Sequence, residues 1–440
     1  MPATLGAITT TEVSSGTLAG ILKDFFLTPV QEQLTQEVMA LELFEKDTVT
    51  WNGLQAIIPV HTARNAGVGS RAENGTLPVA GNQTVRRLAI SARYIYGSFS
   101  LSGPAIEAAK ASNAGALISS MELEMNRVKD DVRDYCNRKL FSGQRIVGFI
   151  HEHVAGGGGR QWEFSGDTAR LAEMLVEALG NVDCQILRMD TYASIYNDEF
   201  SAVDQTGSRI TLVAALDTTA GGVNAIPTGV AMAVMVDEAL VVTKDSEPQG
   251  LYGNLAEAAH FGQDRTDATG DVQLQSIIQT HILTGDHSRG TLAAKRLQGI
   301  FDEIHLQSGQ EPDVLLSHPV MRQEYTALMN NAAASMALDP RTAAKQGDLG
   351  FSGVSFNGKP WTTSRHCGRG LIIFLNKASW CIAELAKFQF ADLDGNVLSR
   401  VANQDTWGGF LRWYMELVCK RPNANAILVG IQFDGAVDGA

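Results

Sequence analysis

The sequence predicts an α+β protein built from two or three structural units. The chain has 440 residues, too many for one ordinary core, and its 45% hydrophobic and 19% charged content is typical of a folded globular protein. Segments with the alternation of β-strands are interleaved with segments of helical periodicity. The 43 glycines, against 12 prolines, favour turns and bent strands over an all-helical design.

Charge and cysteine content exclude several classes of protein. The formal net charge is −13, which argues against a general nucleic-acid binder because such a protein needs a basic face. A container that encloses nucleic acid without adhering to it remains compatible with this charge. The five cysteines are scattered and lack a CxxC pair, which favours buried thiols in a reducing compartment. We find no signal-peptide pattern and no run of the ~18 apolar residues that a membrane span requires.

Residues 1–101 predict two arms in succession, at 1–48 and at 49–101. Residues 1–48 begin small and polar and continue as a short amphipathic helix near Leu18–Leu43. Residues 49–101 predict a long two-stranded arm, with one strand at Gln55–Val60 and a second that alternates from Leu88 to Tyr96. Glycines and a proline between the strands predict a loose tip. A connection of this length is unusual unless it is functional, and we expect another chain to cover it.

A long helix follows the arm. Ser102-Gly103-Pro104 predicts its start, because proline in the first helical turn loses no hydrogen bond. The helical pattern continues to Leu140, and its apolar positions form one continuous stripe. Such a helix would span roughly 55 Å at 1.5 Å per residue. The sequence therefore predicts a spine for an elongated molecule.

The remaining chain predicts a β module and an α/β unit. The predicted elements, in order, are a flexible turn at 151–160, a helix at 167–179, a small β module at 182–237, an irregular stretch at 238–290, a helix from Thr291 capped by Gly309, a strand at 313–317, a helix starting at Pro319, strands at 353–358, 370–375 and 380–385, and a C-terminal hairpin of Phe410–Cys419 with Ala426–Ile431.

One cluster in the sequence has the character of a metal site. His151-Glu152-His153 could place two imidazoles on one side of a strand, but a third ligand at a defined spacing is missing. We therefore favour an exposed turn there and keep a metal-dependent hydrolase using His151 and His153 as an alternative. The chain has no GxSxG, HExxH or GxxxxGK[ST] motif. The sequence predicts neither catalysis nor a cofactor.

The order of elements carries a resemblance to a known family. Together with the stretch GSRAENGTLPVAGNQTVRRLAISARYIYGSFSLSGPAIEAA at 69–109, it resembles the major capsid protein of tailed double-stranded-DNA bacteriophages. This is the Hong-Kong-97-type capsid fold, which encapsulin nanocompartments also use, and the resemblance covers roughly residues 20–435. The implied parts are an N-terminal arm at 1–48, an extended loop at 49–101, a peripheral domain with the spine helix at 102–181, a β-rich insertion at 182–237, an axial domain at 238–395 and a C-terminal return to the peripheral domain at 396–440.

The resemblance implies assembly rather than chemistry. Copies of the chain would form the hexamers and pentamers of an icosahedral shell that encloses a double-stranded DNA genome without reading its sequence. The implied location is the virion capsid, assembled in the host cytoplasm, with no membrane. The implied partners are further copies of the chain, a portal, a decoration protein and a scaffolding protein. We expect the scaffold to be separate, because about 48 residues are too few for a long coiled-coil scaffold.

Charged residues on the arm and on the spine helix are candidates for contacts between subunits. An exposed ion pair contributes only ~0–1 kcal/mol, but a shell repeats each pair many times. For any one pair, the alternative is that the arm residue and the helix residue are both solvated and do not contact each other. The candidates on the arm are Arg71, Glu73, Arg86, Arg87 and Arg93, and those on the helix are Glu122, Glu124, Asp130, Asp131 and Asp134.

Two further functions stay open. An encapsulin-like nanocompartment would use the same fold, and a neighbouring gene for a cargo enzyme would favour it. A tail or baseplate protein would form rings or tubes without closed shells. The length of the chain and its predicted insertion favour the phage shell over the shorter encapsulins.

Residues 49–100 contain no lysine, which generates a first testable prediction. Some members of the family join subunits by an isopeptide bond from a lysine of this loop, and the nucleophile for that bond is absent here. Boiling assembled particles in detergent should therefore release monomers, as judged by gel electrophoresis. A ladder of covalent oligomers would contradict this prediction.

Overall fold

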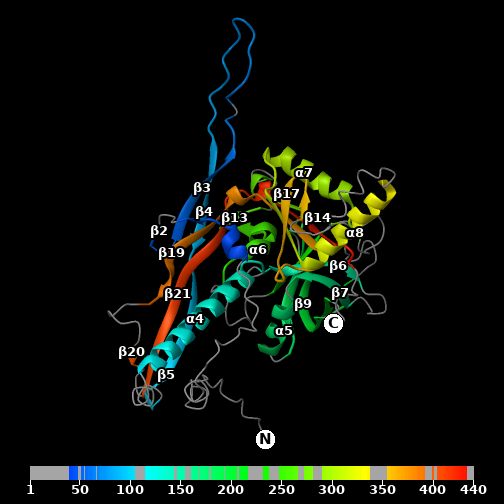
Figure 1. The fold of residues 1–440 in the computed structure, drawn as a ribbon. Helices are drawn as coiled ribbons and strands as arrows, with labels where there is room; N and C mark the ends of the chain where they lie inside the picture. The colour runs from blue at the N-terminus through cyan, green and yellow to red at the C-terminus, as the bar shows by residue number, and fades with distance from the viewer. Residues whose placement is uncertain are drawn as a thin grey trace.

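The computed structural model describes most of the chain. The described residues are 39–47, 51–53, 55–65, 67–104, 114–142, 146–153, 160–166, 168–177, 180–192, 194–205, 208–216, 231–236, 247–265, 272–280, 290–336, 354–391, 399–400 and 404–433. The predicted α+β class is confirmed: long strands form several sheets, and helices cover them (Figure 1). Of the predicted helix near Leu18–Leu43, only α2 (Met39–Leu43) lies in the described ranges.

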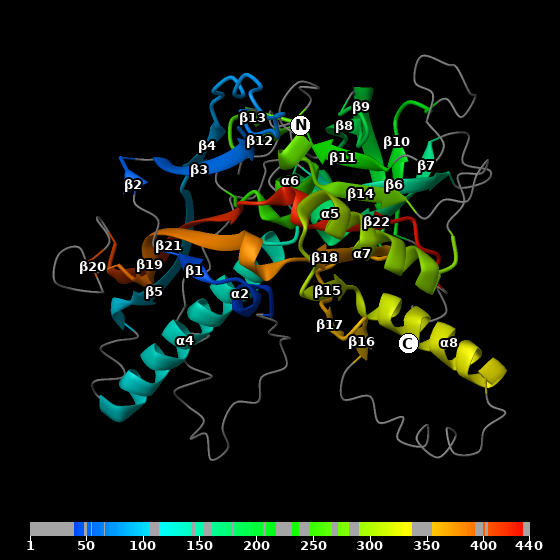
Figure 2. The ribbon, with the colours of Figure 1, turned by 90° about the horizontal axis from the view of Figure 1, so that it is seen from above.

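The molecule has a body from which a narrow two-stranded arm extends (Figure 1). Seen from above, the arm, its supporting sheet and the long helix lie on one side, and the remaining units lie on the other (Figure 2). The two long strands of the arm are β3 (Gln55–Ala63) and β4 (Thr84–Ser91). A third, short strand, β2 (Trp51–Asn52), pairs with the start of β3. β3 and β4 pair antiparallel, which confirms the predicted two-stranded arm.

A five-stranded sheet supports the arm. Its longest strand is β21 (Thr406–Cys419), which pairs with β5 on one edge and with β19 on the other. The predicted second arm strand is thus divided at Ala92: β4 stays in the arm, and the chain after it enters the supporting sheet. The partners of β21 are β5 (Arg93–Ser102), β19 (Trp380–Phe390) and β20 (Ser399–Arg400), and β1 (Lys46–Asp47) pairs with β19.

The predicted spine helix is present as α4 (Ala114–Lys139), and it packs on one face of this sheet. At 1.5 Å per residue, its 26 residues span about 39 Å. Gly97 of β5 permits the close approach, because a Cβ built there would lie 2.4 Å from Cγ2 of Val132 on the helix. The predicted helical residues 105–113 lie outside the described ranges.

A six-stranded mixed sheet with two long helices forms the α/β unit. Helix α7 (Ala294–Ser308) ends at Gly309, whose φ of 68° is left-handed and suits glycine. The predicted strand at 313–317 and the helix after Pro319 are confirmed as β15 (Val314–Ser317) and α8 (Pro319–Met336). The other strands are β14 (Ile277–Thr280), β16 (Val354–Phe356), β17 (Lys359–Thr363), β18 (Leu371–Leu375) and β22 (Ala426–Val429).

The predicted C-terminal hairpin is wrong. β21 and β22 belong to different sheets, and β22 pairs with β14 and β18. Between them, a 3-10 turn at Pro422–Ala424 carries the chain out of one sheet and into the other. Asn425 fixes this crossing, because its Oδ1 accepts hydrogen bonds of 2.9 Å from the backbone N–H of Asn376 and from Nε1 of Trp380. The end of β21 at 415–419 and all of β22 are buried, so their sequences alone do not reveal their partners.

The β module is larger than predicted and is a closed six-stranded barrel. Its strands are β6 (Ile146–His153), β7 (Gln161–Gly166), β8 (Val182–Arg188), β9 (Ser194–Asp204), β10 (Arg209–Leu212) and β11 (Met232–Val236), with α5 (Thr168–Glu177) as its helix. The flexible turn predicted from residue 151 is wrong for 151–153, which continue β6. Residues 146–150 are all buried, so β6 lacks the alternation that marks a half-exposed strand.

Short elements complete the structure. They are α6 (Gly250–Ala256), β12 (Ala259–His260), β13 (Gln263–Asp264) and the 3-10 turns at Val272–Leu274 and Lys377–Ser379. All seven residues of α6 are buried, so this helix fills the junction between the larger units.

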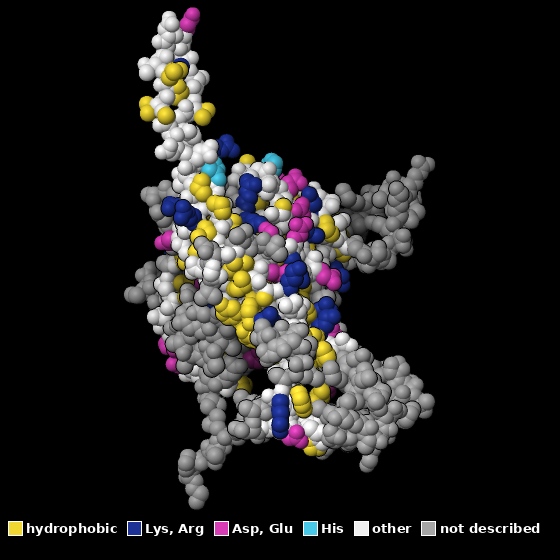
Figure 3. Space-filling view, turned by 90° about the vertical axis from the view of Figure 1, so that its left-hand side faces the viewer, with side chains coloured by type: hydrophobic (Ala, Val, Ile, Leu, Met, Phe, Trp, Pro, Cys, Tyr) yellow, Lys and Arg dark blue, Asp and Glu magenta, His cyan; other side chains and the backbone are white. Residues whose placement is uncertain are grey.

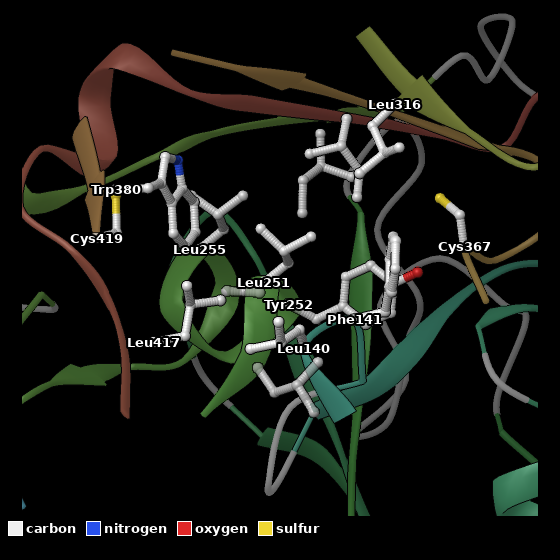
Figure 4. Packing of buried hydrophobic residues seen from close by; sticks show 14 of the residues in the cluster. Leu140, Phe141, Leu251, Tyr252, Leu255, Leu316, Cys367, Trp380, Leu417 and Cys419 are labelled. Carbon is white, nitrogen blue, oxygen red and sulfur yellow. The ribbon is translucent and has the colours of Figure 1, made fainter. Parts of the chain in front are cut away.

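One apolar cluster joins the supporting sheet, the barrel and the six-stranded unit. Figure 4 shows Tyr252 of α6 among side chains from several elements, including Phe141 just after α4, Leu316 of β15 and Leu417 of β21. The barrel contributes Phe149, whose ring lies 5.8 Å from that of Tyr252 in an edge-to-face arrangement. A second cluster fills the barrel interior and includes Trp162. The barrel thus has its own core and is also docked on the common one.

Phe149 tests this docking. Replacement of Phe149 by alanine should lower the free energy of unfolding by about 3–5 kcal/mol, because the side chain is fully buried in the common cluster. Urea denaturation measures the change. Val176→Ala on α5 is the control, since Val176 is 75% exposed and its loss should change stability by less than about 0.5 kcal/mol. Equal stability of the two variants would contradict the docking role.

Candidate functional site

The tip of the arm exposes apolar side chains that the chain itself does not cover. Val68, Leu77 and Val79 are 86%, 80% and 87% exposed. The tip is held by local backbone contacts, such as the 2.9 Å hydrogen bond from the Gly75 N–H to the Ala72 carbonyl. Figure 3 shows hydrophobic side chains along this part of the arm. Exposed apolar side chains on a narrow hairpin make the tip a candidate for contact with another molecule.

The predicted charged residues of the arm lie at its surface. Arg71 and Glu73 are exposed at the tip, where Nε of Arg71 donates to the Thr76 carbonyl at 2.9 Å. Arg87 is exposed and Arg86 half-buried on β4. The backbone carbonyl of Arg87 accepts a 2.9 Å hydrogen bond from Gln263, which ties the lower arm to the body.

Arg93 has a partner within its own chain. Its Nε donates to Oε2 of Glu416 at 3.0 Å, at the point where the arm enters the supporting sheet. Glu416 is fully buried, and its Oε1 accepts from the backbone N–H groups of Gln249 at 2.7 Å and Leu417 at 3.0 Å. Sequence reasoning missed Glu416, because a single glutamate in an apolar strand has no pattern that reveals its partners. This pair fixes the root of the arm.

Two of the predicted acidic residues of α4, Asp130 and Asp134, lie within 4.0 Å of a basic side chain of the same chain. Asp131 is exposed and Glu124 half-buried, while Asp130 lies 3.9 Å from Arg133 one turn along. Asp134 lies 3.7 Å from Nε2 of His366. The side chain of Glu122 lies outside the described residues. The arm points away from α4 (Figure 1), so one chain does not bring the two predicted sets together, and pairing between chains stays a prediction.

The face of the supporting sheet opposite α4 carries a strip of aromatic side chains. Tyr94, Tyr96 and Phe410 are 39%, 56% and 38% exposed. Tyr96 and Tyr414 share a hydrogen bond of 3.0 Å between their hydroxyl groups, which raises the pKa of Tyr96 to about 12. Their rings contact edge to face. We call these four residues the open aromatic face.

The remaining candidates do not form a described site. His151 and His153 lie on β6, and their side chains are outside the described residues. Among the side chains that are described, no three His, Cys, Asp or Glu residues are grouped to hold a metal. All five cysteines are buried, as predicted, and burial raises the pKa of the Cys136 and Cys419 thiols to about 12. In the same ranges, no helix combines the length and apolar character that crossing a membrane requires.

Comparison of the structure with solved proteins identifies the fold. The capsid protein of cyanophage A-1(L) matches with a TM-score of 0.52 over 92% of this chain and 95% of the phage chain, at 13% sequence identity. This chain has the fold of a phage capsid protein. Neither a protein-family model nor a curated protein sequence matches it.

Two further capsids also align over most of their length. The capsid of a native GTA particle aligns over 95% of this chain and 99% of its own at 10% identity, with a TM-score of 0.44. The capsid of Myoviridae phage XM1 aligns over 92% and 95% at 9% identity, with a TM-score of 0.42. The assignment of the capsid-protein fold rests on the cyanophage structure.

In this capsid-protein fold, the exposed arm tip is aliphatic, and the open aromatic face consists of rings beside Arg412, whose guanidinium lies 5.8 Å from the ring of Tyr414. The tip lies beyond the body, as Figure 1 shows, so it does not fold back on the sheet of its own chain. Both surfaces are therefore available to other molecules, and Glu416 sets the position of the strand from which the arm extends.

Glu416 generates a prediction about pH. Burial raises the pKa of Glu416 from 4.5 to about 7, against the opposing effect of Arg93 and two backbone N–H groups. Between these values the folded chain holds a proton that the unfolded chain has lost, so stability from this group falls as the pH rises from about 4.5 to about 7.

The measurement is the free energy of unfolding as a function of pH for the wild type and for Glu416→Gln, which cannot titrate. The advantage of the wild type should be largest at the acid end and shrink toward neutral pH. Parallel curves for the two proteins would contradict the raised pKa.

Proposed function

We propose that this chain is the major capsid protein of a phage, whose copies assemble into the hexamers and pentamers of an icosahedral shell around double-stranded DNA. The observation that carries the proposal is the arm: a hairpin with exposed apolar side chains that reaches beyond its own body. The shared fold with a cyanophage capsid protein supports it. A chain whose apolar surface is not covered internally gains stability when another copy covers it.

The arm tip would dock on the open aromatic face of a neighbouring copy. The tip offers aliphatic side chains, and the face offers aromatic rings, so contact removes apolar surface from water on both sides. Full burial of a valine or leucine side chain is worth about 1.5–3 kcal/mol. Arm and face are different surfaces, so the contact is heterologous and forms rings when its rotation closes.

Ion pairs would form a second contact, because α4 lies on the face of the supporting sheet opposite the open aromatic face. Arg71, Arg86 and Arg87 of one copy would approach Glu122, Glu124, Asp130, Asp131 or Asp134 on α4 of another. Glu73 at the tip would meet basic groups. Arg93 would act within its own chain, because it already pairs with the buried Glu416.

Each structural unit would have its own place in the shell. The supporting sheet with α4 corresponds to a peripheral domain, the six-stranded unit to an axial domain that meets its copies around symmetry axes, and the barrel to an insertion. A net charge of −13 keeps the wall from binding packaged DNA strongly. A separate scaffolding protein, a portal and a decoration protein would be the other partners, with assembly in the host cytoplasm and the virion as the final location.

Charge placed on the arm tip tests this function. The double variant Leu77→Glu, Val79→Glu should form at least tenfold fewer closed shells than the wild type, counted by electron microscopy. Its thermal unfolding should match that of the wild type, because both side chains are exposed in the single chain. Gln83→Glu adds charge at an exposed polar position of the same arm and should assemble normally. Normal assembly of the double variant would contradict the role of the arm.

A further inference from the structure

A cavity of about 470 Å³ lies at the root of the arm, between β3 and the body. A water molecule needs only ~10–15 Å³ on this measure, so the cavity has room for side chains rather than for a single ion. One wall is the arm, at Ile58–His61, and the other is formed by the ends of β21 and the six-stranded unit. The residues of this second wall are Gln273, Gln310, Ala378, Ser379, Lys420, Arg421 and Asn423.

The arm wall of the cavity is the part of β3 that lies beyond its short pairing with β2. The Ala89 N–H donates to the Phe261 carbonyl, and the Arg87 carbonyl accepts from Gln263, so both groups point away from β3. Their antiparallel partners Ile57 and Pro59 must then point away from β4, toward the free edge. Proline has no N–H, and Pro59 therefore interrupts any ladder that an added strand could form. An occupant is better held by side chains than by strand pairing.

The side chains around the cavity favour an acidic occupant. Lys420 and Arg421 carry full positive charge, His61 is exposed at the rim, and no residue of the lining carries a carboxylate. Nζ of Lys420 lies 3.1 Å from Asp47, and one N–H of Arg421 donates to the Ser308 carbonyl at 2.8 Å. Each cation has further N–H groups beyond these bonds.

The side-chain oxygen of a buried asparagine in the lining has no hydrogen-bond partner among the described residues. Asn423 is 3% exposed and donates from Nδ2 to Gln273 at 2.8 Å. Its Oδ1 accepts no hydrogen bond from the described residues. Buried polar atoms are nearly always hydrogen-bonded, so this oxygen indicates a donor from outside the described residues. A peptide segment supplies N–H donors as well as carboxylates.

We propose that this cavity binds an acidic segment of a second copy of the chain and thereby fixes the direction of the arm. The site rests on the proposed shell function. A second copy is the occupant that charge favours, because each chain carries 48 Asp and Glu against 35 Lys and Arg, a net charge of −13. The cavity lies between the arm and the residues that follow β21 and α7, where a neighbour held by the arm would enter. An occupant that contacts both walls holds the arm at one angle.

Crosslinking identifies the occupant. A photoreactive benzophenone amino acid in place of His61 is incorporated into the full chain, and shells are assembled from a mixture of isotopically light and heavy copies. Mass spectrometry should find adducts that join a light to a heavy copy, at a peptide containing Asp or Glu. Adducts confined to one copy, or formed with a different protein, would overturn the proposal.

Charge reversal tests the effect on assembly. His61→Glu should reduce the yield of closed shells at least tenfold, and the loss should be smaller for Lys420→Gln, which removes one charge. Gln83→Glu, on the same arm but away from the cavity, is the matched control. Thermal unfolding of the His61→Glu monomer should equal that of the control, since both positions are exposed.

The two proposals fail in different ways. If the wild type forms shells and His61→Glu forms them equally well, the cavity proposal fails and the shell function stands. If the wild type forms no shells with its neighbouring gene products, the shell function fails, and the cavity proposal with it.

Discussion

Strand β21 is the element on which the rest of the structure depends. It pairs with β5 along one edge and with β19 along the other, so it joins the strand that continues from the arm to the strand that follows the six-stranded unit. Its end is fixed by Asn254 of α6, which accepts from the Cys419 N–H at 3.0 Å and donates to the Leu417 carbonyl at 2.9 Å. A fully buried side chain that satisfies two backbone groups of one strand leaves that strand little freedom.

The burial of Glu416 on the same strand connects this rigidity to the arm. A buried carboxylate is costly unless charges and N–H groups surround it, and here Arg93 and two backbone donors do so. Above the raised pKa of Glu416, where the group is ionised, removing Arg93 would leave the charge without its counter-ion, which costs far more than an exposed pair contributes. Arg93, the first residue of β5, is therefore held in place by the buried carboxyl group of Glu416. This constraint allows a narrow hairpin to hold a direction although its tip has no core.

Local pattern explains which parts of the fold could be predicted. Helix α7 has an apolar stripe and a terminal glycine at left-handed φ, and β3 and β4 flank a glycine-rich tip, so periodicity and turn chemistry agree in both. β6 could not be recognised as the first strand of the barrel, because residues 146–150 are buried on both faces and lack alternation. Neighbouring strands usually pair, so the sequence predicts one hairpin from the segments of β21 and β22. The Asn425 contacts that separate the two strands connect distant residues.

In the candidate site, too, local features could be predicted from the sequence, and contacts between distant residues could not. The arginines and glycines between the two arm strands could be recognised in the sequence, because a compact domain rarely contains so long a connection with so few apolar side chains. The partner of Arg93 and the open aromatic face were not, because each depends on which residues the β5–β21 register places opposite one another. Tyr94 faces Tyr414 in that register, although 320 positions separate them in the chain.

Net charge places a final constraint on how copies can meet. Chains that each carry −13 repel one another, so association requires apolar contact together with local positive groups. The positive groups at the root of the arm, Lys420 and Arg421, lie beside a cavity without carboxylates, and the arm itself carries more arginine than acid. Apolar burial would supply the free energy of contact, and these cations would decide where on an acidic neighbour the contact forms. An acidic chain with basic groups concentrated at its arm can thus self-associate in one orientation while the rest of its surface stays repulsive.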